Sequence, residues 1–159
     1  MSARVVSRGF ALIELLISVA ILGLLAGGAM AFADLAVQRQ NEQILRTNLR
    51  EIRQAIDAYK QAWDAGRVAH SVGDTGYPHA LSELSGGVID ATSAKGSRLY
   101  FLRRLPRDPM ADPALPAEAT WGLRSYDSPP DDPQPGRDVF DVHSLSIRKG
   151  LNGQPYESW

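Results

Sequence analysis

The 159-residue sequence contains no cysteine, which excludes disulfides and thiolate metal sites. Its three histidines stand far apart, and it has neither a phosphate-binding glycine loop nor a Gly-x-Ser-x-Gly nucleophile turn. With 17 basic and 18 acidic residues, the net charge is −1, so the basic footprint of a nucleic-acid-binding protein is missing too. We therefore predict neither an enzyme, with no catalytic residue, nor a nucleic-acid partner.

Charge is almost missing from one long stretch near the N-terminus. Residues 10–33 are apolar or small, and Glu14 is the one charged residue among these 24. At 1.5 Å per residue, such a helix spans roughly 36 Å, more than the hydrocarbon core of about 30 Å. Arg4 and Arg8 precede it, and basic residues stay on the cytoplasmic side. We therefore expect a single-pass transmembrane helix, with a cytoplasmic N-terminus and an exported C-terminal domain.

Glu14 needs an explanation, because a carboxylate near the centre of a span costs on the order of 2.5–3.5 kcal/mol. No Lys, Arg or His lies within residues 10–33. The positive charge available at that depth is the α-amine of Phe10, which exists only if the chain is cut after Gly9. Four residues make about one helical turn, roughly 6 Å, so Glu14 can meet the amine of its own chain or that of a neighbouring subunit. Pairing with the amine of a neighbouring subunit would link one chain to the next and so build a filament.

Gly9-Phe10 and Glu14, within the run FALIELLISVAIL, resemble the prepilin-type leader of type IV pilins and type II secretion pseudopilins. The resemblance implies that residues 1–9 are a leader peptide, which a membrane-embedded prepilin peptidase removes between Gly9 and Phe10. It further implies N-methylation of the new N-terminal Phe10 and a role of Glu14 in subunit assembly.

Two other interpretations of this stretch stay open. An ordinary secretory signal peptide cleaved after Ala29-Met30-Ala31 would release a soluble periplasmic domain that begins at Phe32. Its apolar run would be longer than the usual 7–15 residues or so and would carry a carboxylate. A plain uncleaved anchor, in which Glu14 is incidental, is the other interpretation.

A second helical pattern follows the apolar run. No proline and no internal glycine occurs between Asp34 and Gly66, and Gly66 suits a helix stop, so we expect one helix from Phe10 to about Ala65. An apolar stripe at spacings of three and four predicts a face that packs on a core: Leu45, Leu49, Ile52, Ile56, Tyr59 and Trp63. Because the stripe starts at Leu45, we expect residues 34–44 to form a helical neck and residues 45–159 to form a globular domain.

The remaining chain predicts short elements. Proline in a first turn favours a short helix at residues 78–84. Residues 120–126 can form a strand between two loop-rich segments, and alternating apolar and polar residues favour a strand at 139–145. Asn152-Gly153 indicates a tight turn, after which Tyr156 and Trp159 can hold the end to the sheet. Together these features predict an α+β class, which is the type IV pilin-like fold if the resemblance holds: a long helix packed on a small antiparallel sheet with loops.

Two later segments resemble the major, G-type pseudopilins of type II secretion systems: Leu105-Pro106-Arg107-Asp108-Pro109 and Phe140-Asp141-Val142-His143-Ser144. The tryptophan and glycine that often follow the first segment appear later here, as Trp121-Gly122. The resemblance implies a structural subunit of the pseudopilus, polymerised from the inner membrane to drive export of folded proteins. It also implies that the single-pass helix lies in the inner membrane, that the C-terminal domain is periplasmic, and that the assembled filament is periplasmic. The implied partners are the prepilin peptidase, copies of the chain, other pseudopilins and the inner-membrane secretion platform. A type IV pilus or competence pilin is the alternative, which the missing cysteine pair disfavours.

Major pseudopilins commonly bind calcium in a C-terminal loop, and calcium needs six to eight oxygen ligands. After Asp141 this chain offers Glu157 as its one further carboxylate. We therefore expect no cofactor and no metal, with Asp127 and Asp138 as weak candidates for a calcium site.

Overall fold

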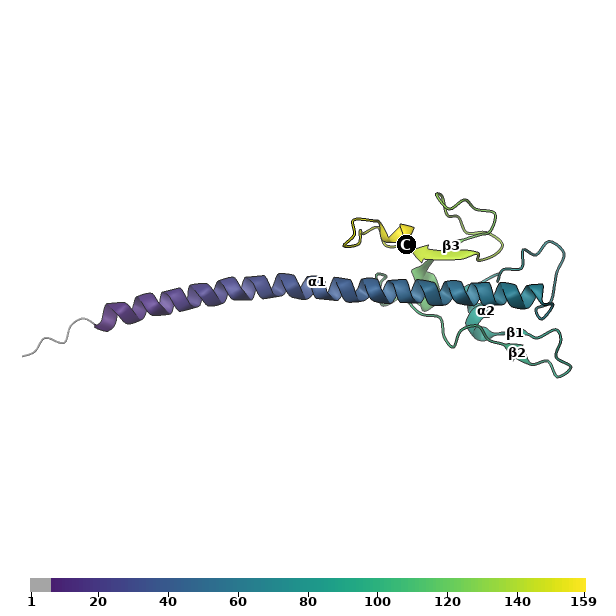
Figure 1. The fold of residues 1–159 in the computed structure, drawn as a ribbon, viewed down its shortest axis with the longest axis horizontal. Coiled ribbons are helices and arrows are strands. Elements are labelled where there is room, and N and C mark those ends of the chain that lie inside the picture. Colours follow the sequence, from purple (N-terminus) through teal and green to yellow (C-terminus); the bar gives the residue numbers. More distant parts are fainter. Residues whose placement is uncertain (1–6) are drawn as a thin grey trace, which may run out of the picture. The chain divides into compact units, whose positions relative to one another are not determined.

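The computed structural model describes residues 7–159, apart from the side chains of residues 7–11 and 25–31. The chain divides into two compact units, Met1–Gln40 and Asn41–Trp159. One long helix, α1, runs from Ser7 to Asp64 and contributes to both units (Figure 1). The expected neck, residues 34–44, spans the boundary between the units.

The first unit is helical throughout its described part. Its large apolar side chains are exposed, for example Leu12 at 64% and Leu24 at 82%. Over the residues that the structure describes, no helix is at once long enough and apolar enough to cross a membrane. The expected membrane segment, residues 10–33, includes side chains outside the described set.

The second unit is built on the outer half of α1, and the predicted apolar stripe is confirmed there. Leu45 and Ile52 are fully buried, Tyr59 is 5% exposed, and Trp63 packs against the core from its edge. The helix ends at Asp64, one residue before the predicted end, and Gly66 follows as the expected stop with a φ of 71°. The Gly66 amide donates to the Trp63 carbonyl and the Arg67 amide to the Ala62 carbonyl, a pattern in which a left-handed glycine satisfies the last carbonyl groups of the helix.

Two small antiparallel sheets pack against this helix. Strand β3, Trp121–Arg124, pairs with β4, Asp141–Ser144, so that Trp121 lies opposite Ser144. Strand β1, Val88–Ile89, pairs with β2, Arg98–Leu99. The predicted α+β class is confirmed, and the arrangement is consistent with a type IV pilin-like fold. The two expected strands are present but shorter, and the pair β1–β2 was not expected.

Helix α2, Leu81–Gly86, begins three residues later than the sequence predicts. Ala80 is extended, with φ −151° and ψ 154°, and the Pro78 carbonyl accepts a hydrogen bond from the Val139 amide instead of opening the helix. A contact between distant segments therefore sets this helix start. Leu81 and Leu84, the expected apolar pair, are fully buried.

Two 3-10 helices complete the unit. The first, η1, covers Ala117–Thr120 and leads into β3, and the second, η2, covers Tyr156–Ser158. Between β4 and η2 the chain reverses at Asn152-Gly153 as predicted, with Gly153 at φ 79° and a bridge between Lys149 and Pro155.

Candidate functional site

The processing residues lie near the start of α1. Gly9 and Phe10 are helical, and their side chains lie outside the described residues, so their roles stay predictions. Glu14 is exposed on the same helix, and its main-chain carbonyl accepts a 2.8 Å hydrogen bond from the Ser18 hydroxyl. The Glu14 carboxylate forms no ion pair with any residue that the structure describes.

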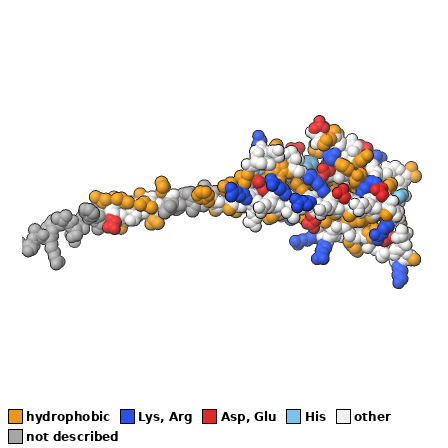
Figure 2. All heavy atoms as spheres, viewed as in Figure 1, with side chains coloured by type: hydrophobic (Ala, Val, Ile, Leu, Met, Phe, Trp, Pro, Cys, Tyr) orange, Lys and Arg blue, Asp and Glu red, His pale blue; other side chains and the backbone are white. Residues whose placement is uncertain are grey.

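The surroundings of Glu14 are apolar on every side of the helix. All side chains of residues 12–24 are exposed, and Glu14 is the one charged group among them. Figure 2 shows hydrophobic side chains along this part of the chain. A helix that is apolar all round is normally covered by lipid or by other helices. A positive charge that pairs with Glu14 must then belong to the lipid or to the helices that cover this segment.

Residues 5–30 match the family model described as the prokaryotic N-terminal methylation motif. This motif is the prepilin leader of type IV pilin-like proteins, which are structural subunits of a pilus or pseudopilus. It implies processing by a prepilin peptidase and assembly into pilus-like polymers. No curated protein and no solved structure matches the chain.

In the second unit, the two pseudopilin-like segments meet at a buried carboxylate. Asp108 is 2% exposed, and its Oδ2 accepts a 2.5 Å hydrogen bond from the Ser144 hydroxyl. Its Oδ1 accepts from the Met110 amide at 2.7 Å, and its own amide donates to the Thr120 hydroxyl at 3.1 Å. Asp108 thus fastens the proline-flanked turn to strand β4.

Trp121 and Gly122 lie beside the same proline-flanked turn. The Trp121 indole donates a 2.9 Å hydrogen bond to the Pro106 carbonyl, so β3 is tied to the turn as well. Gly122 lies beneath the His143 ring, where a built Cβ would stand 2.3 Å from Cε1. The sequence placed these residues in separate motifs, and the pairing of β3 with β4 brings them together.

The two calcium candidates are engaged with other groups. Asp138 is 2% exposed, and its Oδ1 accepts from the Ser125 hydroxyl and the Tyr126 amide, both at 2.9 Å, while Oδ2 accepts from Thr75. Asp127 pairs with Arg137 at 3.0 Å. Among the residues that the structure describes, no group of three or more acidic or histidine side chains is arranged to hold a metal ion.

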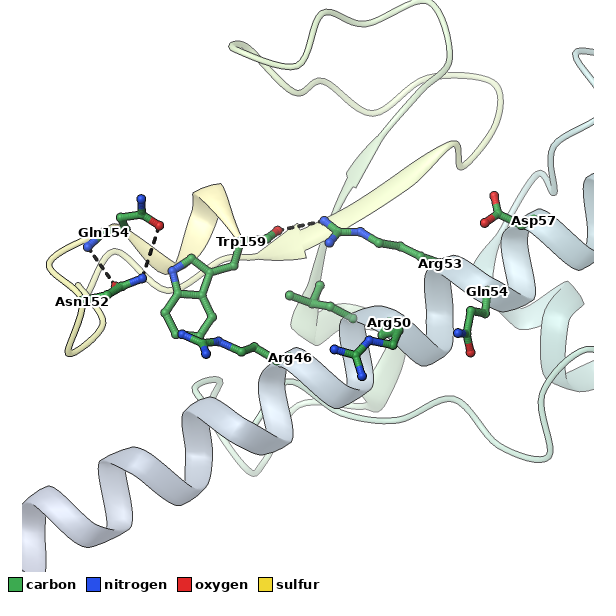
Figure 3. Close-up of a pocket in the computed structure, with 9 residues that line it drawn as sticks. Arg46, Arg50, Arg53, Gln54, Asp57, Asn152, Gln154 and Trp159 are labelled. Atoms are coloured by element: carbon green, nitrogen blue, oxygen red, sulfur yellow. Dashed lines mark hydrogen bonds between the residues drawn. The ribbon is translucent and has the colours of Figure 1, made fainter.

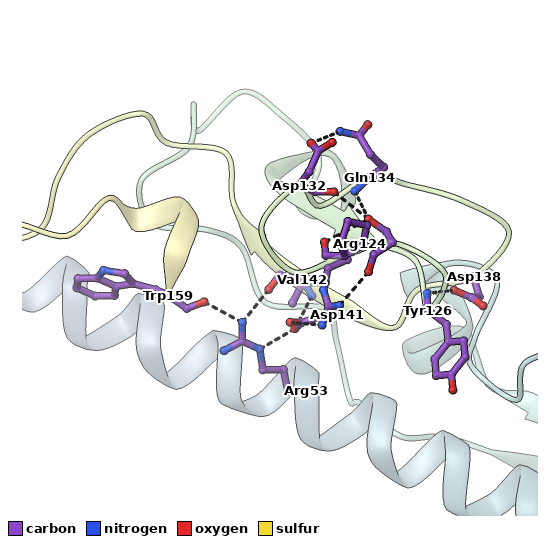
Figure 4. A network of polar contacts seen from close by, with 11 residues as sticks. Arg53, Arg124, Tyr126, Asp132, Gln134, Asp138, Asp141, Val142 and Trp159 are labelled. Atoms are coloured by element: carbon purple, nitrogen blue, oxygen red, sulfur yellow. Dashed lines mark hydrogen bonds and ion pairs between the residues drawn. The ribbon is translucent and has the colours of Figure 1, made fainter.

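An arginine on α1 holds the end of the domain. The Arg53 guanidinium lies 2.7 Å from the Asp141 carboxylate and also donates to the carbonyls of Val142, at 3.1 Å, and Trp159, at 2.8 Å (Figure 4). Arg124 reaches the other oxygen of Asp141 at 3.5 Å. These contacts connect α1, β4 and the last residues of the chain.

Beside this network, a groove of about 590 Å³ opens along α1 (Figure 3). Its lining combines three arginines, one aspartate, one glutamine and one leucine of α1 with polar and aromatic groups from the C-terminal segment: Arg46, Leu49, Arg50, Arg53, Gln54, Asp57, Asn152, Gln154 and Trp159. None of the three arginines belongs to the predicted apolar stripe, and no sequence pattern indicated the groove.

Asp90 and Tyr59, which both lie outside the groove, have shifted pKa values. Hydrogen bonds from Thr92, then from Arg67, lower the pKa of Asp90 to about 2. Burial, reinforced by the negative charge of Glu83, raises the pKa of Tyr59 well above its usual range. Both shifts follow from contacts inside the folded unit and are properties of its stability.

Proposed function

We propose that this chain is a structural subunit of a pilus-like filament, processed at Gly9–Phe10 and assembled from the inner membrane. The observation that carries the proposal is the methylation motif at residues 5–30, with Glu14 fifth after the cleavage position. The exposed apolar helix around Glu14 supports it, because such a surface requires lipid or neighbouring helices.

In this proposal, cleavage after Gly9 creates an α-amine on Phe10, which is then methylated and stays cationic. The carboxylate of Glu14 pairs with this cation on an adjacent subunit. Residues 10–33 reside in the inner membrane and then pack in the filament core. Close packing and polar pairs must drive this step, because lipid tails are as apolar as the helix. Small side chains within the segment allow close approach: Gly23, Ala26, Gly27, Ala29 and Ala31.

We further propose that the filament is the pseudopilus of a type II secretion system, which drives export of folded proteins. The contact of Asp108 with Ser144 supports this assignment, because the two pseudopilin-like segments act as one structural unit. The other expected partners are further pseudopilins and the inner-membrane secretion platform. A type IV pilus or competence pilin is the alternative, and the genes beside this one discriminate between the two systems.

The first experiment determines the N-terminal residue and its mass on chain recovered from native membranes. Phe10 carrying one extra methyl group is the expected result. Phe32 would identify a soluble periplasmic domain released after Ala31, and an intact Met1 would identify an uncleaved anchor; either result overturns the proposal.

Substitution of Glu14 tests the assembly step separately. Glu14→Gln preserves size and removes the charge, so it should leave cleavage at Gly9 intact and abolish incorporation into filaments. Glu14→Asp, which keeps the charge on a shorter side chain, is the matched control and should retain part of the incorporation. Normal incorporation of Glu14→Gln would contradict a pairing with the Phe10 amine.

A further inference from the structure

We propose that the groove beside α1 receives an acidic loop tip, Asp131-Asp132, from a second copy of this chain. The inference rests on the proposed function, since it assigns a contact between filament subunits. It is carried by the charge of the groove, by the shape and charge of the loop, and by the symmetry of the contact that the two would make.

The groove presents two arginines that the subunit itself does not neutralise. Of its three arginines, Arg53 is paired with Asp141. Arg46 and Arg50 are exposed and form no ion pair with any described residue. They stand one turn apart on α1, where like charges repel each other and destabilise a helix. An acid from outside would relieve this repulsion.

The groove also holds its basic groups in place. The Arg46 guanidinium lies 4.3 Å from the centre of the Trp159 ring, a cation–π contact that orients it along the wall. Asn152 and Gln154 lie beside Trp159 on the C-terminal segment and are linked to each other by hydrogen bonds of 3.3 and 3.1 Å (Figure 3). Figure 2 shows Lys and Arg side chains gathered over this part of the larger unit. A carboxylate entering here meets oriented donors.

The same chain carries a matching acidic tip. In the segment Pro129-Pro130-Asp131-Asp132-Pro133, both aspartates are exposed and neither forms an ion pair with a described residue. The neighbouring Asp127, by contrast, is already paired with Arg137. The tip therefore projects two negative charges that nothing described in the subunit neutralises.

The tip is rigid, which favours docking. Three prolines fix φ within five residues, and the base of the loop is closed by a 3.0 Å hydrogen bond from the Ser125 amide to the Gln134 carbonyl. The Ser128 hydroxyl accepts from the Gln134 amide at 2.8 Å and donates to the Asp132 carbonyl at 3.0 Å (Figure 4). A preorganised loop loses little conformational entropy on binding.

The symmetry of such a contact agrees with a filament. Groove and tip are different surfaces, so each copy would donate a tip to one neighbour and accept a tip from another. Contacts of this heterologous kind generate open helical assemblies when the rotation does not close a ring.

The acidic tip does not occupy the groove of its own subunit. Pro130 and Pro133 line a smaller cavity with Arg53, whereas Asp131 and Asp132 line neither that cavity nor the groove.

Cross-linking between two differently tagged full-length copies tests the contact. One copy carries Arg50→Cys and the other Asp131→Cys, and both are expressed in a host that has a prepilin peptidase. Because the chain has no cysteine, only the introduced thiols react. A short bis-maleimide is used, since a paired Arg and Asp stand farther apart than a disulfide can bridge. Dimers that carry both tags are expected. The control copy carries Glu118→Cys, an exposed position on η1, and should yield few such dimers.

Charge reversal provides a second measurement. Arg46→Glu with Arg50→Glu should cause loss of recovered filament, and adding Asp131→Arg with Asp132→Arg should restore it. Arg103→Glu with Arg104→Glu, an exposed pair without described contacts, is the matched control and should leave filament unchanged. Loss without rescue and without mixed-tag dimers would assign the groove to another protein and overturn the proposal.

The two proposals fail in different ways. If the unaltered chain shows methylated Phe10 and forms filament while groove and tip variants behave as wild type, only the groove contact is overturned. If the unaltered chain forms no filament, the proposed function is overturned and the contact with it.

Discussion

The Tyr156 hydroxyl donates a 2.9 Å hydrogen bond to the Glu42 carboxylate, which joins the end of the chain to the start of the globular unit. Glu42 is 7% exposed, and its Oε1 also accepts from the Leu151 amide at 2.8 Å. A buried carboxylate is stable only when hydrogen bonds replace its hydration. The contact therefore determines how the C-terminal segment lies on α1, and with it one wall of the groove.

Removing the Tyr156 hydroxyl should loosen this connection. Tyr156→Phe keeps the buried ring and deprives Glu42 of one donor, so we expect a loss of about 1–3 kcal/mol in the free energy of unfolding. Denaturant unfolding of the full chain in detergent micelles measures it. Tyr100→Phe, at a tyrosine that is 63% exposed, is the matched control and should unfold as the unaltered chain does. Equal stability of the two variants would contradict the role given to Glu42.

The periodic features of α1 were predictable from the sequence, and Glu42 shows where prediction stopped. Spacings of three and four residues identified the buried face from Leu45 onward, because a helix repeats every 3.6 residues. One turn earlier the pattern reaches Glu42, a polar residue, which the sequence assigned to an exposed neck. Its burial depends on Tyr156, a partner 114 residues away that no local pattern reveals.

Local sequence patterns likewise predicted only part of the sheets and of the site. Strand β4 alternates between apolar and polar residues and was predicted from that pattern, whereas β1 and β2, at two residues each, are too short to show a period. The leader motif is local and was readable directly. The contact between Asp108 and Ser144, and the groove beside Arg46, arise from tertiary packing and needed the structure.

The buried carboxylate of Asp108 should be sensitive to its hydroxyl donor. Ser144→Ala leaves Oδ2 without that hydrogen bond at a site that is 2% exposed, so we expect a destabilisation of about 1–3 kcal/mol. Ser71→Ala is the control, since Ser71 is exposed and contacts Asp74 through its main-chain amide and carbonyl. Denaturant unfolding compares the two, and an unchanged midpoint for Ser144→Ala would show that this contact does not hold the turn to β4.

Gly76 should tolerate no side chain. Its φ of 86° lies in the left-handed region, and a built Cβ would stand 2.8 Å from the Trp63 ring. Gly76→Ala combines backbone strain with displacement of a core residue, so we expect a loss of about 1–3 kcal/mol. Gly86→Ala is the matched control, because that position has open space and no positive φ. Thermal unfolding followed by circular dichroism measures both, and similar behaviour of the two variants would contradict the prediction.

Asp90 should make the stability of the domain depend on acid pH. Its pKa in the folded chain is about 2, whereas an unperturbed aspartate titrates near 3.9. Between these two pH values the unfolded chain binds more protons at Asp90 than the folded chain does. The stabilisation that Asp90 contributes is therefore complete above about pH 4 and is lost as the pH falls toward 2. Unfolding free energies measured across this range should fall more steeply for the unaltered chain than for Asp90→Asn. Thr92→Val, which removes the 2.6 Å hydroxyl donor and keeps the main-chain one at 3.0 Å, should give an intermediate slope. Parallel curves for the unaltered chain and Asp90→Asn would show that the contacts of Asp90 with Thr92 and Arg67 contribute no pH-dependent stability.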